Sequence, residues 1–335
     1  TTIVGATSGD TGSAAIEACR DKKLIEIFML HPAGRVSEVQ RRQMTTVQSR
    51  NVHNIALNGT FDDCQDMVKT IFADHSFCKQ FHISAVNSIN WVRILAQVVY
   101  YFWSALALGA PDRKVIFSVP TGNFGNVFAG YAAHRMGLPV EKFIVASNAN
   151  DILTRFFETG KMSIAEVVST LSPSMDIQIS SNFERLLYEI CQRNGETVTK
   201  LMERFRSQGA VNFGKLRWKA ICQKFEGHRV DDNTIRDTIN RVYQRSGELL
   251  DPHTAVGYVA GKQALAKYDN TVITLATAHP AKFPDAMEMA TGDHPALPPH
   301  LHDLFERKEI FSNLPNDFDS IRDFISGILD QGIST

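Results

Sequence analysis

Residues 114–137 constrain the fold of this chain more than any other stretch, because they predict a strand, a glycine-rich loop and a helix in direct succession. Apolar, β-branched residues from 115 to 119 predict a buried strand, and small residues at helical spacing follow from Val127. Between them, residues 122–126 are Gly-Asn-Phe-Gly-Asn. Glycines allow close backbone approach, and a helix N-terminus offers free N–H groups to an anion. The glycines alone leave two interpretations open, a phosphate site and an ordinary tight turn.

A second turn from strand to helix lies near the start of the chain, where residues 6–12 are Ala-Thr-Ser-Gly-Asp-Thr-Gly. Hydroxyl groups and backbone N–H groups gathered at a helix start suit a carboxylate or a phosphate. Serine and threonine in this position also act as simple helix caps. The pattern by itself therefore indicates either an anion site or a cap.

Residues 85–93 place two amides, a hydroxyl and the guanidinium of Arg93 just before a long apolar run. Arginine is a strong bidentate ligand of phosphate, and its position at the start of a helix favours such a role. A solvent-exposed arginine at a helix start is the alternative.

Alternating strand-like and helical pieces between residues 24 and 57 predict a parallel sheet with right-handed crossovers. The 335 residues, 44% of them hydrophobic, suffice for two cores. We therefore expect an α/β chain with two domains of parallel sheet flanked by helices. The expected boundaries are a smaller domain at 1–90 and a larger one at 91–335, with an added helical region at about 150–248.

Charge and cysteine content argue against several classes of function. A formal net charge of -1 gives no electrostatic reason to expect nucleic acid or an anionic membrane as a partner. The five cysteines form neither a CxxC pair nor a metal-binding spacing, so we expect no metal and a reducing, cytoplasmic setting. The apolar run at 94–110 contains several polar residues and predicts a buried helix instead of a membrane span. A small molecule is the expected partner.

The loop at 122–126, with Pro120 and Thr121 before it, resembles the cofactor-phosphate loop of the threonine synthase family. These are pyridoxal-phosphate enzymes of the tryptophan-synthase-β fold type, also called fold type II. The turn at 6–12 and the stretches at 31–44 and 58–65 are similar to other signatures of the same family. Stretches within the expected helical region resemble the longer bacterial and fungal branch.

The resemblance implies that pyridoxal phosphate is the cofactor and that O-phospho-L-homoserine and water are converted to L-threonine and phosphate. It implies a monomer or a weak homodimer. The implied cofactor-binding residues are Gly122, Asn123, Phe124, Gly125, Asn126 and Thr277, the last with its hydroxyl at the pyridine nitrogen. The implied substrate-binding residues are Thr7, Ser8 and Thr11 for the amino acid, and Asn87, Ser88 and Arg93 for its phosphate. Asp10 belongs to the same substrate-binding turn, at a position where related enzymes often carry Asn beside the cofactor's ring oxygen.

The resemblance places the family's Schiff-base lysine a few tens of residues before the turn at 6–12, which is upstream of Thr1, and no lysine of this sequence occupies that place. The chain opens at Thr1 directly within a strand pattern, so we expect a fragment that alone forms no threonine. Lys22 and Lys23 lie in a charged turn, and Lys282 lies outside the family's lysine motif. Two alternatives stay open: a related phospholyase that releases a keto acid, and a non-catalytic ligand-binding protein.

Two histidines receive structural interpretations. His31 at a strand end is typical of a hydrogen-bonded loop histidine. Asp251 and Pro252 before His253 form a standard helix start, which we favour over acid-base chemistry.

Overall fold

The computed structural model describes residues 1–7, 9–86 and 90–333 and divides the chain into two compact units. Unit 1 contains residues 1–88 together with 296–335, and unit 2 contains residues 89–295. Each unit is built around its own parallel sheet, so the α/β class expected from the sequence is confirmed.

Unit 1 has a five-stranded sheet in the order β11-β3-β2-β1-β4, with every neighbouring pair parallel. Alternate residues of β2 enter two separate cores, because successive side chains of a strand point to opposite faces. Phe28 and Leu30 lie in one core, and Ile27 and Met29 lie in the other. The strands are β1 (Thr2–Ala6), β2 (Glu26–Pro32), β3 (Val52–Leu57), β4 (Ile83–Ala85) and β11 (Ser312–Leu314).

The strand pattern expected at the start of the chain is confirmed by β1. Thr1 directly precedes this strand and is exposed, and its amino group donates to the Leu24 carbonyl oxygen at 2.9 Å. The Thr1 carbonyl oxygen accepts from the Glu26 N–H at 3.0 Å, which continues the pairing of β1 with β2 by one residue.

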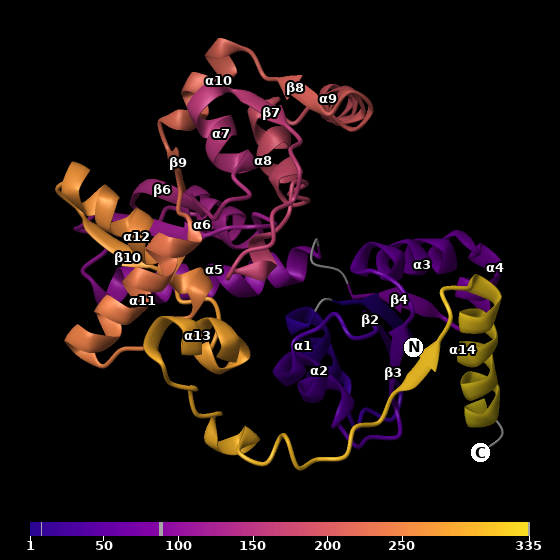
Figure 1. The fold of residues 1–335 in the computed structure, drawn as a ribbon. Helices are drawn as coiled ribbons and strands as arrows, with labels where there is room; N and C mark the ends of the chain where they lie inside the picture. The colour runs from indigo at the N-terminus through magenta and orange to yellow at the C-terminus, as the bar shows by residue number, and fades with distance from the viewer. Residues whose placement is uncertain (8, 87–89, 334–335) are drawn as a thin grey trace. The chain divides into compact units, whose positions relative to one another are not determined.

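Helices cover both faces of this sheet, as Figure 1 shows for α1 and α2 on one side and α14 on the other. Ile16 of α1 and Met44 of α2 pack into one core, whereas Met67 of α3 and Ile325 of α14 pack into the other. The helices are α1 (Asp10–Cys19), α2 (Glu38–Thr45), α3 (Phe61–Ala73), α4 (His75–Gln80) and α14 (Phe318–Ile333), with a short 3-10 turn η3 (Pro299–Leu301).

The C-terminal tail differs from the sequence-based boundary, which assigned it to the larger domain. Residues 296–335 belong to unit 1, because β11 pairs with β3 and Ile321 of α14 is fully buried in the unit 1 core. A strand of three residues carries too little local signal to be predicted from sequence.

Unit 2 has a four-stranded parallel sheet in the order β10-β5-β6-β9 and a separate antiparallel pair, β7 with β8. All six residues of β5 are buried, as expected of a strand covered on both faces. The strands are β5 (Val115–Pro120), β6 (Val140–Ser147), β7 (Lys161–Ser163), β8 (Ala210–Asn212), β9 (Phe225–Arg229) and β10 (Thr271–Thr274).

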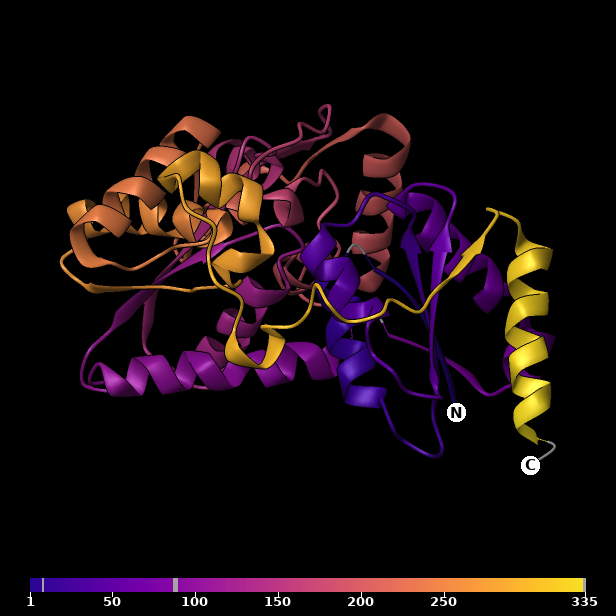
Figure 2. The same ribbon diagram turned by 60° about the horizontal axis from the view of Figure 1, so that its bottom comes forward.

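Two groups of helices cover the sheet of unit 2, and Figure 2 shows α5 on the opposite side from the orange helices. The first group includes α5 (Trp91–Ala107) and α6 (Gly125–Arg135), and the second includes α11 (Asp232–Ser246), α12 (Pro252–Lys267) and α13 (Pro284–Thr291). The remaining elements are α7 (Ile152–Thr159), α8 (Phe183–Ile190), α9 (Gly195–Gln208), α10 (Lys215–Cys222), and the 3-10 turns η1 (Pro173–Met175) and η2 (Pro280–Lys282). The region expected to be helical at 150–248 thus also supplies β9 to the main sheet.

Helix α5 differs from the fully buried helix that its apolar sequence predicts. Ile94 and Tyr101 are fully buried, but Val99 is 67% exposed and Trp103 is 76% exposed. Across the described residues, none of the helices combines the length and the apolar character needed to span a bilayer.

Candidate functional site

The loop between β5 and α6 has the backbone conformation of an anion site. Phe124, immediately before α6, has a left-handed backbone with φ 63°, which is uncommon for a residue other than glycine. Phe124, the N-cap residue of α6, makes no side-chain cap hydrogen bond. The first N–H groups of a helix have no intrahelical partner, so the turn at Gly125 and Asn126 offers donors to a negatively charged group. These residues fit a phosphate.

The carbonyl groups of the same loop are held from the opposite direction by the segment at 180–182. The Ser180 hydroxyl donates to the Gly122 carbonyl oxygen at 2.9 Å, and the Asn182 N–H donates to the Asn123 carbonyl oxygen at 3.1 Å. The loop's acceptors are therefore occupied within the protein. This arrangement fixes the loop independently of any ligand.

The side chains of Phe124 and Asn126 anchor the loop. The Phe124 ring is 1% exposed and packs edge-on against Phe183 with centroids 5.0 Å apart. The Asn126 amide oxygen accepts hydrogen bonds from the hydroxyls of Tyr100 at 2.9 Å and Tyr101 at 2.8 Å. Burial raises the pKa of the Tyr101 phenol well above its usual range, so this hydroxyl remains a donor. The Phe124 side chain and the Asn126 amide oxygen are therefore engaged within the protein.

Sequence reasoning missed Tyr100 and Tyr101 as partners of the loop. They lie on α5, 26 and 25 residues before Asn126. The available signal was the phenol of Tyr101 within a mainly apolar helix, since a buried phenol normally requires a partner.

Thr277 lies just beyond β10, the neighbour of β5 in the sheet. Its backbone N–H donates to the Thr254 hydroxyl oxygen at 3.2 Å, and its side chain is exposed. The structure thus places Thr277 and the loop at 122–126 at the carboxyl ends of adjacent parallel strands, where ligands of open α/β sheets bind.

The turn at 6–12 lies at the carboxyl end of β1 in unit 1, and Thr7 shapes it. The Thr7 hydroxyl oxygen accepts from the N–H groups of Gly9 and Gly12, both at 2.9 Å, and the residue is 1% exposed. A methyl group at Gly12 would lie 2.4 Å from the Thr7 Cγ2 atom, so α1 can begin here only without a side chain at that position. The geometry supports a role for Thr7 in holding the turn.

Asp10 and Thr11 occupy the first turn of α1. The Asp10 carboxylate accepts from the Gln40 side-chain amide at 3.0 Å, and Gln40 is 7% exposed. Thr11 is half-buried. Gln40 was missed as part of this turn, although it lies within the stretch at 31–44 that resembles a family signature. Ser8 lies outside the described residues.

Arg93 is in the first turn of α5 and half-buried. Its backbone carbonyl accepts from the Gln97 side-chain amide at 3.1 Å. Among the residues that the structure describes, its guanidinium makes no hydrogen bond or ion pair, which leaves the charge free for a ligand. Asn87 and Ser88 lie outside the described residues.

The helix start predicted at Asp251 is confirmed. The Asp251 carboxylate accepts from the N–H groups of His253 and Thr254 at the start of α12. His31 differs from expectation: it is 1% exposed, and within the described chain neither ring nitrogen has a hydrogen-bond partner. Burial lowers its pKa.

The lysines weighed in the sequence lie in a turn of unit 1 and in a 3-10 turn of unit 2. Lys22 and Lys23 are exposed in the turn after α1. Lys282 ends the 3-10 turn η2. The place expected for the Schiff-base lysine precedes Thr1 and is not part of this sequence, so that assignment stays a prediction.

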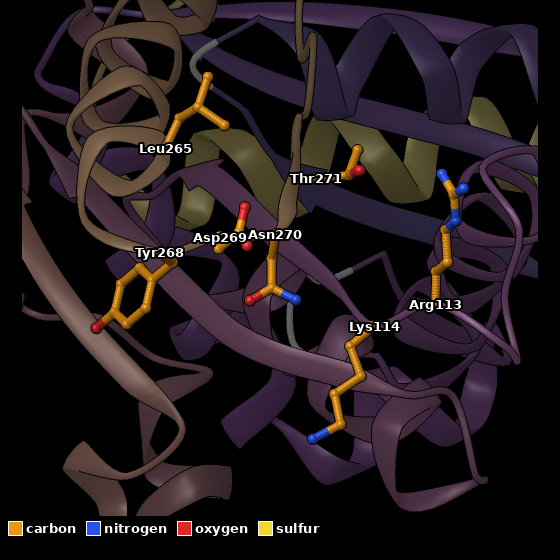
Figure 3. A pocket seen from close by; sticks show the side chains of 7 residues that line it. All are labelled: Arg113, Lys114, Leu265, Tyr268, Asp269, Asn270 and Thr271. Atoms are coloured by element: carbon orange, nitrogen blue, oxygen red, sulfur yellow. The ribbon is translucent and has the colours of Figure 1, made fainter.

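A surface hollow lies at the opposite edge of the unit 2 sheet, near the amino ends of β5 and β10 (Figure 3). Its side chains diverge: the cationic groups of Arg113 and Lys114 point away from each other in Figure 3, and Lys114 pairs with Glu141 at 3.1 Å. This hollow has no convergent polar groups and is a poor candidate for the site. It is lined by Arg113, Lys114, Leu265, Tyr268, Asp269, Asn270 and Thr271. In the described part of the chain, no group of three histidine, cysteine or acidic residues could hold a metal ion.

Comparison with known proteins decides the family. Residues 1–204 match the model of the pyridoxal-phosphate dependent enzymes, and residues 254–325 match the threonine synthase C-terminal model. A threonine synthase from Pseudomonas aeruginosa is 54% identical over 97% of this chain and 69% of its own length. This chain belongs to the threonine synthase family.

Further relatives support this membership of the threonine synthase family. A threonine synthase from Schizosaccharomyces pombe is 44% identical over 94% of this chain and 68% of its own length. A crystal structure of pyridoxal-phosphate-bound threonine synthase from Brucella melitensis matches 98% of this chain and 70% of its own, with 50% identity and a TM-score of 0.93. The fold type II architecture, the pyridoxal-phosphate cofactor class and the lyase class expected from the sequence are confirmed.

Proposed function

We propose that this protein catalyses the threonine synthase reaction, which converts O-phospho-L-homoserine and water to L-threonine and phosphate. One observation of the structure supports this most: the loop at 122–126 combines a left-handed Phe124 with an uncapped start of α6 at the carboxyl edge of a parallel sheet. A phosphate is the group that such backbone donors suit. Family membership then selects pyridoxal phosphate.

The cofactor is proposed to bind within unit 2. The N–H groups of Gly125 and Asn126 would hold its phosphate, with Gly122, Asn123 and Phe124 setting the backbone path. The Thr277 hydroxyl would meet the pyridine nitrogen. When bound, pyridoxal phosphate supplies an electron sink that stabilises a carbanion at the substrate's α-carbon. The protein would hold the cofactor at its phosphate and at its pyridine nitrogen, and these two contacts would orient the ring.

The substrate is proposed to bind through two groups of residues. The first turn of α1, with Thr11 and Asp10 and with Thr7 holding the turn, would bind the amino acid's carboxylate through N–H groups at the helix N-terminus. Ser8 belongs to the same proposed group. The guanidinium of Arg93, together with Asn87 and Ser88, would grip the substrate's phosphate, which leaves as inorganic phosphate.

The test is product analysis with O-phospho-L-homoserine and pyridoxal phosphate, on the protein as its gene encodes it. Phosphate release accompanied by an equal amount of threonine is the expected result. Phosphate release with a keto acid would identify a phospholyase instead. Visible absorbance from bound cofactor without any phosphate release would identify a non-catalytic binding protein.

We also propose that the protein acts in the cytoplasm as a monomer or a weak homodimer. Sedimentation velocity at several protein concentrations tests the oligomeric state: a single species of constant mass, or a mass that rises gradually with concentration, is expected. A concentration-independent larger assembly would contradict it.

A further inference from the structure

Asp251 has more hydrogen-bond donors around it than a helix cap requires. The residue is 1% exposed, and its carboxylate accepts from the backbone N–H groups of His253 at 2.9 Å and Thr254 at 3.3 Å. These two bonds satisfy the start of α12. The same carboxylate also accepts from the His253 ring and from the Thr254 hydroxyl. The two additional bonds come from side chains in the first turn of α12, and each of these side chains also contacts a second segment of the chain.

One of these side chains, His253, connects Asp251 to Ser174 by hydrogen bonds. Its ring Nδ1 lies 2.9 Å from the Asp251 Oδ1 atom, and its Nε2 lies 3.2 Å from the backbone nitrogen of Ser174. A backbone N–H can only donate, so Nε2 must be the acceptor and Nδ1 must carry the proton. The neutral ring is therefore held in one tautomer between a carboxylate and the 3-10 turn η1.

Ser174 in turn lies beside the loop at 122–126. A Cβ atom added at Gly122 would lie 2.8 Å from the Ser174 carbonyl oxygen and 3.2 Å from the Met175 Cα atom. The backbones of η1 and the loop are thus packed so closely that only glycine fits. The position of η1 therefore limits where the loop's first residue can lie.

The other side chain, Thr254, connects Asp251 to Thr277 by hydrogen bonds. The Thr254 hydroxyl donates to Asp251, and its oxygen accepts from the Thr277 N–H at 3.2 Å. A single hydroxyl thereby connects the buried carboxylate to the residue expected at the pyridine nitrogen. Helix α12 itself is fixed against the sheet, because the Ser118 hydroxyl of β5 donates to the Gly257 carbonyl oxygen at 2.6 Å.

We propose that Asp251, His253 and Thr254 are positioning residues. Through hydrogen bonds that begin at the buried Asp251 carboxylate, they hold in place the residues at both ends of the cofactor site. His253 serves the phosphate end through Ser174 and Gly122, and Thr254 serves the ring end through Thr277. This inference rests on the proposed function, because it takes the loop at 122–126 and Thr277 as the cofactor's contacts.

The first experiment needs no cofactor, so it tests the network even if the proposed function fails. Hydrogen exchange is followed by mass spectrometry in segments 172–176 and 275–279. Thr254→Val keeps the side chain's shape but can neither donate nor accept, so segment 275–279 should exchange faster while 172–176 stays unchanged. His253→Ala should show the reverse. Thr254→Ser, which retains the hydroxyl, should restore the exchange of segment 275–279.

Uniform acceleration in both segments for each variant, or no change in either, would overturn the proposal. Loss of the folded far-ultraviolet spectrum in Thr254→Val would also count against it, because that result indicates a purely structural hydroxyl. Asp251→Asn should accelerate both segments, since both connections begin at this carboxylate.

The second experiment follows pyridoxal phosphate bound to the protein as its gene encodes it. The phosphorus-31 resonance reports the phosphate end, and the visible absorption band reports the ring end. We expect His253→Ala to shift the resonance and Thr254→Val to shift the band, each with about tenfold weaker cofactor binding. Wild-type spectra and affinity in both variants would overturn the positioning role. Absence of any binding by the unchanged protein would instead refute the proposed function, while the exchange data still decide the network.

Discussion

Within the loop at 122–126, side chains and backbone groups have separate tasks. Phe124 and Asn126 use their side chains to hold the loop against α8 and α5, and Gly125 begins α6 with no side chain at all. A left-handed backbone at a buried phenylalanine is costly and persists only where the surroundings enforce it. In the proposed phosphate site, this conformation would aim consecutive N–H groups at one point.

Gly125→Val should abolish uptake of pyridoxal phosphate while the fold is retained. An added Cβ would lie 3.3 Å from the Asn182 side-chain nitrogen and would meet no other described residue within 4 Å. The branched side chain would instead fill space beside the N–H groups that the phosphate needs. Visible absorbance after gel filtration measures cofactor uptake, and circular dichroism measures the fold.

Gly195→Val is the matched control, because Gly195 is also the first residue of a helix, α9, and beyond its chain neighbours and its own helix backbone no described atom lies within 4 Å of its added Cβ. This variant should bind cofactor normally. Normal absorbance in Gly125→Val would show that the loop does not hold the phosphate.

Arg93→Ala should raise the KM for O-phospho-L-homoserine about thirtyfold, since a charge-assisted bidentate contact is worth about 2 kcal/mol. Arg93→Lys should recover only part of this loss, because lysine lacks the planar fork. Steady-state kinetics provide the measurement. Arg113→Ala, an exposed arginine near the opposite edge of the same sheet, should leave KM unchanged. Unchanged kinetics in Arg93→Ala would exclude the phosphate role.

Between elements, polar side chains tie α12 to its neighbours at both ends. At its N-terminus, Asp251 and Thr254 connect the helix to the loop beyond β10. At its C-terminus, Glu226 of β9 accepts hydrogen bonds from Lys267 at 2.8 Å and from Tyr268 at 2.6 Å. Helix α12 is only weakly amphipathic, so these hydrogen bonds help to fix its orientation on the sheet.

The Glu226 cluster should contribute stability that disappears in acid. Burial raises the pKa of this carboxyl, but hydrogen bonds from Lys267, Tyr268 and His228 outweigh burial and lower the pKa to about 2. A carboxyl whose pKa is lowered by folding stabilises the native state above its ordinary pKa of 4.5, and this contribution is lost as the pH falls toward 2.

Glu226→Gln should therefore be less stable than the wild type at pH 7, and the difference in unfolding free energy should shrink steadily below about pH 4.5. Urea unfolding at a series of pH values measures this difference. A difference independent of pH would show that the charge of Glu226 is not what stabilises the cluster.

Across the whole chain, the C-terminal tail completes the unit in which the chain begins. β11 extends the unit 1 sheet beyond β3, and α14 closes one of its two cores. Within the same tail, Glu309 pairs with Arg41 of α2 at 2.9 Å and accepts from the Thr45 hydroxyl at 2.7 Å. Unit 2 is therefore an insertion between two parts of unit 1 in the sequence.

Ile325→Ala should destabilise unit 1 by about 2 to 5 kcal/mol, because Ile325 is fully buried and its truncation leaves a cavity. Hydrogen exchange should show faster exchange in β2 and β3 and no change in β5 and β6. Leu265→Ala, which truncates a side chain that is 57% exposed, should change stability by about 0.5 kcal/mol or less. Loss of protection in β5 and β6 with Ile325→Ala would contradict the assignment of the tail to unit 1.

The sequence alone determined the features that depend on residues adjacent to one another in the chain. The apolar residues at 115–119 and 52–57 follow patterns typical of strands, and the structure has strands there. The glycines at 122–126 and the Asp-Pro pair at 251–252 marked helix starts, because caps and turns are chosen by local backbone geometry.

Only the tertiary structure decided which distant residues meet. The bond from Ser174 to His253 spans 79 positions, and the pairing of β11 with β3 joins opposite ends of the chain. Tyr101 and Asn126 likewise meet only after α5 packs beside α6. Such contacts depend on how whole elements pack, and no local pattern records them. The sequence therefore predicted the loop that suits a phosphate, whereas the fold supplied the residues that hold this loop in place.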